Sequence, residues 1–163
     1  MSNVDPDLIA MMDGVFAEQR ENPAGDLWRR LDGLGLVRLT GPEASGGSGA
    51  GWFEAAELIG ATVRHAVRVP LAEHDLLACW LLDSQDQPVD AGRRTVCLLD
   101  ESRRARAVPW AAGADRIVVV WASDDGYRVA DADAATLRIT PGTNLIGEPR
   151  DTVAVIDALD GIP

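Results

Sequence analysis

The hydrophobic pattern of this chain changes its period part-way along the sequence. In the first half, apolar residues recur every three to four positions, as on one face of an α-helix. After the polar stretch 84–88 they come in short runs rich in β-branched side chains and separated by turn residues, which is typical of strands. We therefore predict an α+β protein, with an N-terminal α-helical bundle followed by a small antiparallel β-barrel or sandwich domain. The predicted limits are 1–83 for the helical domain, 84–92 for a linker and 93–163 for the β-domain.

Capping residues and apolar spacing place the helices. The first is predicted to start at Pro6 with Asp5 as its N-cap, and to break at 21–25. The second starts near Asp26 and ends at Gly35. Two more are expected, over 52–64 and after Pro70. The apolar face of the second helix carries Leu27, Trp28, Leu31 and Leu34, and that of the fourth carries Leu71, Leu77, Trp80 and Leu81.

The strongest strand is predicted at 117–121, whose sequence is Ile-Val-Val-Val-Trp. Asp124-Asp125-Gly126 follows it as a hairpin turn. Further strands are predicted at 96–99, 105–110, 127–129, 136–140 and 152–156.

Charge excludes several kinds of function. The net charge is −11 and all fifteen basic residues are arginine, so lysine chemistry such as a Schiff base or a P-loop is excluded. The acidic balance argues against nucleic acid as a partner, because binding a phosphate backbone needs a clustered positive face. The densest basic run, Arg103-Arg104-Ala105-Arg106, is interpreted as a solvated turn or, alternatively, as a contact for a phosphate or an acidic partner.

No signal peptide and no membrane span are predicted, since no apolar run reaches the roughly 18 residues that a membrane helix needs. Cys79 and Cys97 lack the spacing of a metal site. Two isolated cysteines favour a reducing, cytoplasmic compartment.

No catalytic or metal-binding residue can be named from residue chemistry alone. The glycine-rich segment 41–51 has neither a P-loop Lys nor the GxGxxG spacing, and is interpreted as a flexible connection. His65 is expected at a helix end and His74 on a solvated face. Glu54 and Glu57 lie one helical turn apart, but adjacent turns of one helix rarely flank a substrate cleft.

An ordered series of motifs resembles the acyl-CoA dehydrogenase family over about residues 5–158. The segment 27–36, followed by Gly41-Pro42-Glu43-Ala44-Ser45-Gly46-Gly47-Ser48-Gly49, is similar to the family pattern L-W-x-x-L-x-x-x-G-L and then P-E-x-x-G-G-x-G. The helix 54–60 also fits. Residues 113–120 resemble a strand of the family's middle β-domain, and 144–155 resemble its later loop and strand.

The resemblance implies a flavin-dependent oxidoreductase that oxidises an acyl-CoA thioester to its 2,3-enoyl form, with FAD as cofactor. The acyl group, whether fatty, branched or sterol-derived, stays open. In the family a carboxylate base lies on a C-terminal helical domain, for which no residues follow Pro163, so this chain is expected to carry no catalytic base. A homo-oligomer or a partner dehydrogenase subunit is also implied.

The resemblance also places the flavin site, although the sequence departs from the family there. At the position of the family's T-E-P-x-x-G-S-D segment only Glu101 matches. On the next flavin-side strand Pro109 offers neither a hydroxyl nor an N–H, whereas Trp110 could stack on a ring. The predicted FAD-binding residues are Leu99, Asp100, Glu101, Val108, Pro109 and Trp110.

These departures leave two alternatives open. The chain could be a non-catalytic subunit or scaffold that pairs with an intact acyl-CoA dehydrogenase. It could also be an unrelated protein that binds a small ligand.

Overall fold

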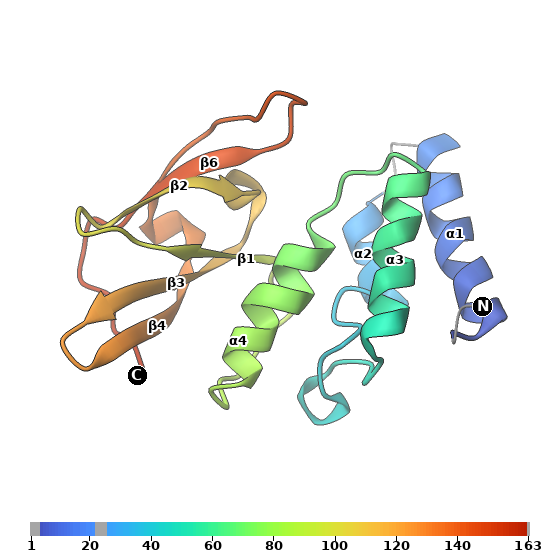
Figure 1. The fold of residues 1–163 in the computed structure, drawn as a ribbon, viewed down its shortest axis with the longest axis horizontal. Helices are drawn as coiled ribbons and strands as arrows, with labels where there is room; N and C mark the ends of the chain where they lie inside the picture. Colours follow the sequence, from blue (N-terminus) through green and yellow to red (C-terminus); the bar gives the residue numbers. More distant parts are fainter. Residues whose placement is uncertain (1–3, 22–25, 163) are drawn as a thin grey trace. The chain divides into compact units, whose positions relative to one another are not determined.

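The computed structural model describes residues 4–21 and 26–162 of the chain. They form two compact units, Met1–Asp75 and Leu76–Pro163, helical and β-rich respectively (Figure 1). The predicted α+β class is confirmed. The expected break at 21–25 lies mostly outside the described residues, and the domain limits 1–83, 84–92 and 93–163 stay a prediction. None of the described helices has the length and apolar character needed to cross a bilayer.

The helical unit is built around three helices and a long connection. As predicted, Asp5 caps the first helix by accepting the N–H of Asp7 at 2.8 Å. Asp26, predicted only as the start of the second helix, caps that helix by accepting the N–H of Arg29 at 3.1 Å. These helices are α1 (Pro6–Glu21), α2 (Leu27–Gly33) and α3 (Trp52–Arg64), with α1 beside α3 (Figure 1). Their core comprises Met12, Val15, Phe16, Leu31, Leu36, Val37, Leu39, Leu58, Ala61 and Leu71.

Two predictions for this unit are wrong. Leu34 is 44% exposed rather than part of the apolar face, because α2 ends at Gly33, before the helical spacing could carry it inward. The glycine-rich segment is an ordered turn rather than an open linker. It contains the short 3₁₀ helix η1 (Glu43–Ser45) and bonds back to the preceding chain, for example from Gly49 N–H to the Gly41 carbonyl at 2.9 Å.

The helix after Pro70 is not a regular α-helix. A π-helical stretch, η2 (Ala72–Cys79), leads into α4 (Trp80–Asp83). A π-turn bonds i to i+5 and so rotates later residues away from the α-helical register. Leu77 and Trp80, predicted on the apolar face, are therefore 48% and 58% exposed, whereas Ala78 and Leu82 are buried.

Six strands form two three-stranded sheets. In the first, ordered β1-β3-β4, β3 and β4 form the predicted hairpin, and β1 runs parallel to β3. In the second, ordered β2-β6-β5, all pairs are antiparallel. The bounds are β1 (Arg94–Leu98), β2 (Arg104–Pro109), β3 (Arg116–Ser123), β4 (Gly126–Asp133), β5 (Arg138–Thr140) and β6 (Arg150–Ala154), with short 3₁₀ helices η3 (Ala111–Gly113) and η4 (Ala134–Thr136).

The continuous apolar run of β3 is explained by burial on both faces. Ile117 and Val119 belong to the core that side chains of both sheets form, together with residues such as Val153 of β6. Val118 points the other way and packs with Ala78 and Leu82 of the helix. Both faces of the first sheet are therefore covered, whereas one face of the second sheet is exposed to solvent.

Candidate functional site

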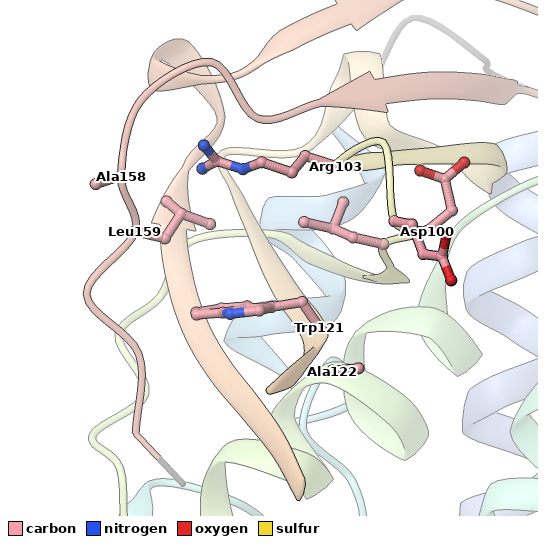
Figure 2. A pocket seen from close by; sticks show the side chains of 8 residues that line it. Asp100, Arg103, Trp121, Ala122, Ala158 and Leu159 are labelled. Carbon is pink, nitrogen blue, oxygen red and sulfur yellow. The ribbon is translucent and has the colours of Figure 1, made fainter. Parts of the chain in front are cut away.

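A cavity of about 680 Å³ opens on the β-rich unit, within the volume range of small-molecule sites. The wall combines apolar side chains and an indole ring with one guanidinium and two carboxylates (Figure 2). In the view, Asp100 lies at the end opposite Ala158 and Leu159. The lining residues are Leu99, Asp100, Glu101, Arg103, Trp121, Ala122, Ala158 and Leu159.

The turn after β1 is held by its own hydrogen bonds. Leu99 continues the strand by donating its N–H to the Val120 carbonyl at 2.8 Å. The Asp100 carboxylate accepts the Ser102 hydroxyl at 2.6 Å and the Arg104 N–H at 3.0 Å. These bonds, the Ser102 hydroxyl first, lower the pKa of Asp100. Asp100 is thus an ionised turn residue at neutral pH and not a proton donor.

The C-terminal segment 157–162 forms the opposite wall. Arg103 donates to the Asp157 carbonyl, and Ile162 exchanges two backbone hydrogen bonds with Val129 of β4, at 2.8 and 2.9 Å. Between these anchors, Gly161 lies against the Trp121 indole: a Cβ there would meet Cζ2 at 2.8 Å and Cη2 closer still. The absence of a side chain at Gly161 lets the segment close on the ring.

Gly161→Ala is therefore expected to displace the segment or the indole and to destabilise the protein by about 1–3 kcal/mol, the usual cost of overpacking. Urea denaturation measures the loss, and the Trp121 indole N–H resonance reports the displacement. Gly113→Ala is the matched control, since a Cβ at Gly113 meets nothing within 4 Å. Equal stability of the two variants would contradict the packing argument.

The six predicted FAD-binding residues do not gather around one cavity. Those at 99–101 line it, but none of those at 108–110 does. Val108 is 3% exposed and belongs to the core between the sheets. Pro109 is half-buried, and Trp110 is half-buried with a left-handed backbone (φ 59°) at the start of η3.

The described residues therefore fit a flavin only in part. The cavity offers an indole and aliphatic carbons to a flat ring, but Val108 is unavailable to a ligand and Pro109 has no N–H to donate. Sequence reasoning missed the other lining residues, because Arg103, Trp121 and Leu159 come from three separate segments. Only the fold brings them together.

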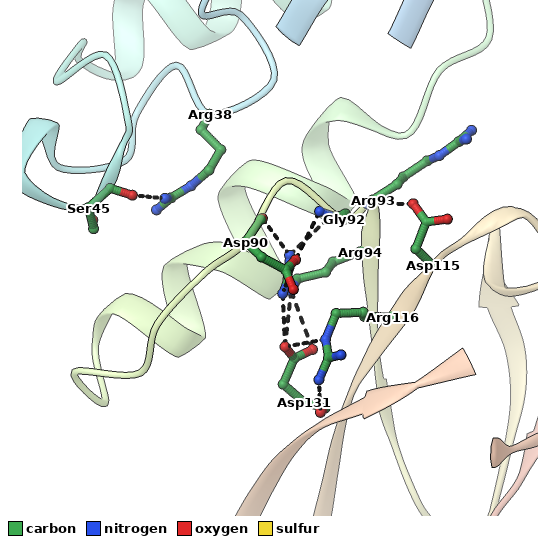
Figure 3. A network of polar contacts seen from close by, with 9 residues as sticks. All are labelled: Arg38, Ser45, Asp90, Gly92, Arg93, Arg94, Asp115, Arg116 and Asp131. Carbon is green, nitrogen blue, oxygen red and sulfur yellow. Dashed lines mark hydrogen bonds and ion pairs between the residues drawn. The ribbon is translucent and has the colours of Figure 1, made fainter. Parts of the chain in front are cut away.

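A second polar cluster lies on the helix-covered face of the first sheet (Figure 3). The Arg94 side chain, 1% exposed, bonds Asp131 at 2.9 Å and Asp90 at 2.8 Å, and Arg116 bonds Asp131 at 2.6 Å. Burial opposes the charge of Arg94, but its bonds to Asp131 and Asp90 outweigh burial and raise its pKa. Two cations thus meet two anions. The cluster links β1, β3 and β4 and also lines a second cavity of about 390 Å³.

The other candidate residues have structural roles. His74 is 2% exposed and packs edge-on to Trp28 at 5.0 Å between ring centroids, so the predicted solvated position is wrong. His65 lies 3.2 Å from Asp13 at the end of α3. Glu54 caps α3 by accepting the Gly51 N–H at 2.9 Å.

Burial raises the pKa of the Cys97 thiol to about 12, which makes it a poor nucleophile. Within residues 4–21 and 26–162, no group of three acidic, His or Cys side chains is placed to hold a metal.

Several solved structures share this fold, although neither a protein-family model nor a curated protein matches the chain. The ChsE4-ChsE5 complex from Mycobacterium tuberculosis matches with a TM-score of 0.79 at 20% identity, over 99% of this chain and 57% of that chain. A variant of the Tcur3481-Tcur3483 steroid ACAD matches with a TM-score of 0.73 at 22% identity, over 95% and 55%. An acyl-CoA dehydrogenase from Geobacillus kaustophilus matches with a TM-score of 0.65 at 13% identity, over 100% and 58%.

These matches confirm the fold that the motif series predicts. The chain has the fold of part of an acyl-CoA dehydrogenase. It spans a little more than half the length of the proteins it matches.

Proposed function

We propose that a chain with this partial acyl-CoA dehydrogenase fold forms the helical and β-domain portion of a flavin-dependent enzyme that oxidises an acyl-CoA thioester to the 2,3-enoyl-CoA. The observation that carries the proposal is the cavity at Leu99, Asp100 and Glu101, which lies where the motif series predicts contacts to flavin and acyl chain. Because one matched structure is described as a steroid ACAD, a sterol-derived acyl group is the variant of this proposal that we favour.

The contribution of this chain is binding rather than proton transfer. In such an enzyme the flavin supplies the hydride acceptor. Trp121 and Leu159 would cover an apolar portion of the bound molecules, and Arg103 would face a carbonyl oxygen or an anionic group. Asp100 is occupied by the turn, so no step of proton abstraction is assigned to it. Cys79 and Cys97 are both buried and form no disulfide among the described residues, which is compatible with a cytoplasmic setting.

Titration with FAD tests the proposal. The purified chain is expected to bind FAD saturably, seen as a change in the absorbance of the flavin at about 450 nm. Trp121→Ala is expected to weaken binding about tenfold, because it removes the indole ring from the cavity wall. Trp80→Ala is the control, because Trp80 is 58% exposed and does not line the cavity. If titration of the wild-type chain with FAD gives no saturable change in the flavin absorbance, the result would count against the proposal.

A second candidate is a subunit that supports a complete dehydrogenase without binding flavin itself. Two of the matched structures are named for two proteins, and Pro109 weakens the predicted flavin strand. The structure also leaves apolar side chains of α3 uncovered, with Trp52, Phe53 and Val63 between 66% and 74% exposed. A surface of this kind favours a partner subunit or a second copy. Purification from the native host decides between the candidates: a dehydrogenase that co-purifies with the chain supports the subunit, and a monomer contradicts it.

A further inference from the structure

The uncovered face of the second sheet is basic. Arg104 of β2 and Arg138 of β5 both pair with Ala154 of the central strand β6, so the three residues form one row across the sheet. Their neighbours along the strands, Ala105 and Val153, point into the core. Because side chains alternate between the two faces of a strand, Arg104, Ala154 and Arg138 share the solvent face.

Alternation along β2 places a third arginine, Arg106, on this face, and a β-bulge adds Ala107 beside it. The pairing of β2 with β6 shifts between Ala105 and Val108, so that Arg106 and Ala107 together oppose Thr152. A bulge of this kind lets two consecutive residues point to the same side, and both Arg106 and Ala107 are exposed. Ala107 takes a left-handed backbone (φ 55°), which marks the bulge as a specific local conformation.

The floor between the arginines consists of small and hydroxylic side chains. Thr140 and Thr152 pair in the next row, beside Ala154. Adjacent strands lie about 4.8 Å apart, so Arg104 and Arg138 are rooted about 10 Å apart, with Arg106 about 7 Å along β2. Arginine side chains can converge on one group across that distance. We name the solvent face formed by Arg104, Arg106, Arg138, Thr140, Thr152 and Ala154 the arginine face.

Few carboxylates within the β-rich unit pair with the arginines of the arginine face. Among the residues that the structure describes, Arg104 and Arg138 form no salt bridge. Arg106 interacts with the charge of Asp100, whose carboxylate is already engaged by the turn. Arg150, next along β6, is paired with Glu148 at 3.2 Å. In a chain with a net charge of −11, three such arginines on one small face are unusual.

Size decides what kind of anion fits. Three short strands present roughly 200 Å² at these spacings, well below the roughly 800 Å² that each partner buries in a typical protein complex. The chain's negative charge disfavours nucleic acid. A phosphate group accepts bidentate hydrogen bonds from several guanidinium groups, and hydroxyl donors can add to them. We propose that the arginine face binds the phosphate or diphosphate group of a small ligand, with Arg104, Arg106 and Arg138 as its ligands.

Titration of the full chain with inorganic pyrophosphate, at constant ionic strength, tests this site by calorimetry. We expect saturable binding with a Kd below about 1 mM. Arg104→Gln/Arg138→Gln is expected to weaken it at least about tenfold. Arg20→Gln/Arg29→Gln changes the net charge equally, at exposed positions of α1 and α2, and is expected to bind as the wild type does. Circular dichroism checks that both variants fold.

Three results would overturn the proposal: no saturable binding by the wild type, equal loss in both double variants, or binding of a poly-glutamate peptide that Arg104→Gln/Arg138→Gln abolishes and that pyrophosphate does not displace. The last result would assign the arginine face to an acidic protein instead. The site does not depend on the proposed enzymatic function. Pyrophosphate binding without FAD binding would support the arginine face and contradict the flavin proposal, so the two can fail separately.

Discussion

Asp131→Ala is expected to lower the free energy of unfolding by about 3–5 kcal/mol, because it leaves a buried guanidinium without its main partner. Arg94 is 1% exposed and bonds Asp131 through Nη2 at 2.9 Å and through Nε at 3.3 Å. Arg116 loses a partner in the same step, since it bonds the same carboxylate. Urea denaturation followed by circular dichroism measures the change.

Asp90→Ala is the matched control for this prediction. Its carboxylate also bonds Arg94, but the Asp90 side chain is 64% exposed, and an exposed ion pair contributes only about 1 kcal/mol or less. Arg94→Leu/Asp131→Leu is expected to recover much of the stability lost in Asp131→Ala, because it removes both buried charges together. If Asp131→Ala lowers the free energy of unfolding no more than Asp90→Ala does, the buried network does not stabilise the sheet as its geometry indicates.

The elements of the fold follow from local sequence signals. Asp5 caps the first helix as predicted, the second helix begins after Asp26 where a start is predicted, and Asp124-Asp125-Gly126 turns the β3–β4 hairpin. These signals act between residues close in the chain, so they are visible without the fold. The bounds of α3 match the range 52–64 that the apolar spacing predicts, and in the structure Glu54 caps its start by accepting the Gly51 N–H.

Features that depend on distant residues were not predictable. The parallel pairing of β1 with β3 requires β2 to leave the first sheet and join the second, and no local pattern encodes that choice. No local pattern marks Arg94 as a buried residue, yet the fold buries it against Asp131, which lies 37 positions later. Leu77 and Trp80 matched an α-helical face, and the π-helical stretch altered that register.

The candidate site was likewise predictable from the sequence only in part. The resemblance placed residues 99–101 at a site, and the structure places them at a cavity. It also grouped 108–110 with them, because both segments meet one flavin in the family, whereas in this chain 108–110 lie outside the cavity wall. The arginine face was visible in sequence only as the run 103–106. Arg138 joins it through strand pairing, and the solvent face that Arg104 and Arg106 share is known only once Ala105 is placed in the core.

Asp151→Ala is expected to destabilise the β-rich unit by about 3–5 kcal/mol, since hydrogen bonds to a charged group contribute about 1.5–3 kcal/mol each. Asp151 is 1% exposed on β6. Its two carboxylate oxygens accept the Ala112 N–H at 2.7 Å and the Gly142 N–H at 3.0 Å. It therefore ties the η3 turn and the chain before β6 to the centre of the second sheet.

The same substitution is expected to free the Trp110 backbone, because η3 begins directly after that strained residue. Near-ultraviolet circular dichroism reports the tryptophan environment, and urea denaturation reports the stability. Asp151→Asn keeps one carbonyl acceptor and should lose about half as much. Asp133→Ala is the control, since Asp133 is exposed and caps η4 with a single bond to the Ala135 N–H at 2.9 Å, worth about 1 kcal/mol. Equal losses in Asp151→Ala and Asp133→Ala would show that the buried carboxylate does not organise the turn, and that Trp110 is held by the strand alone.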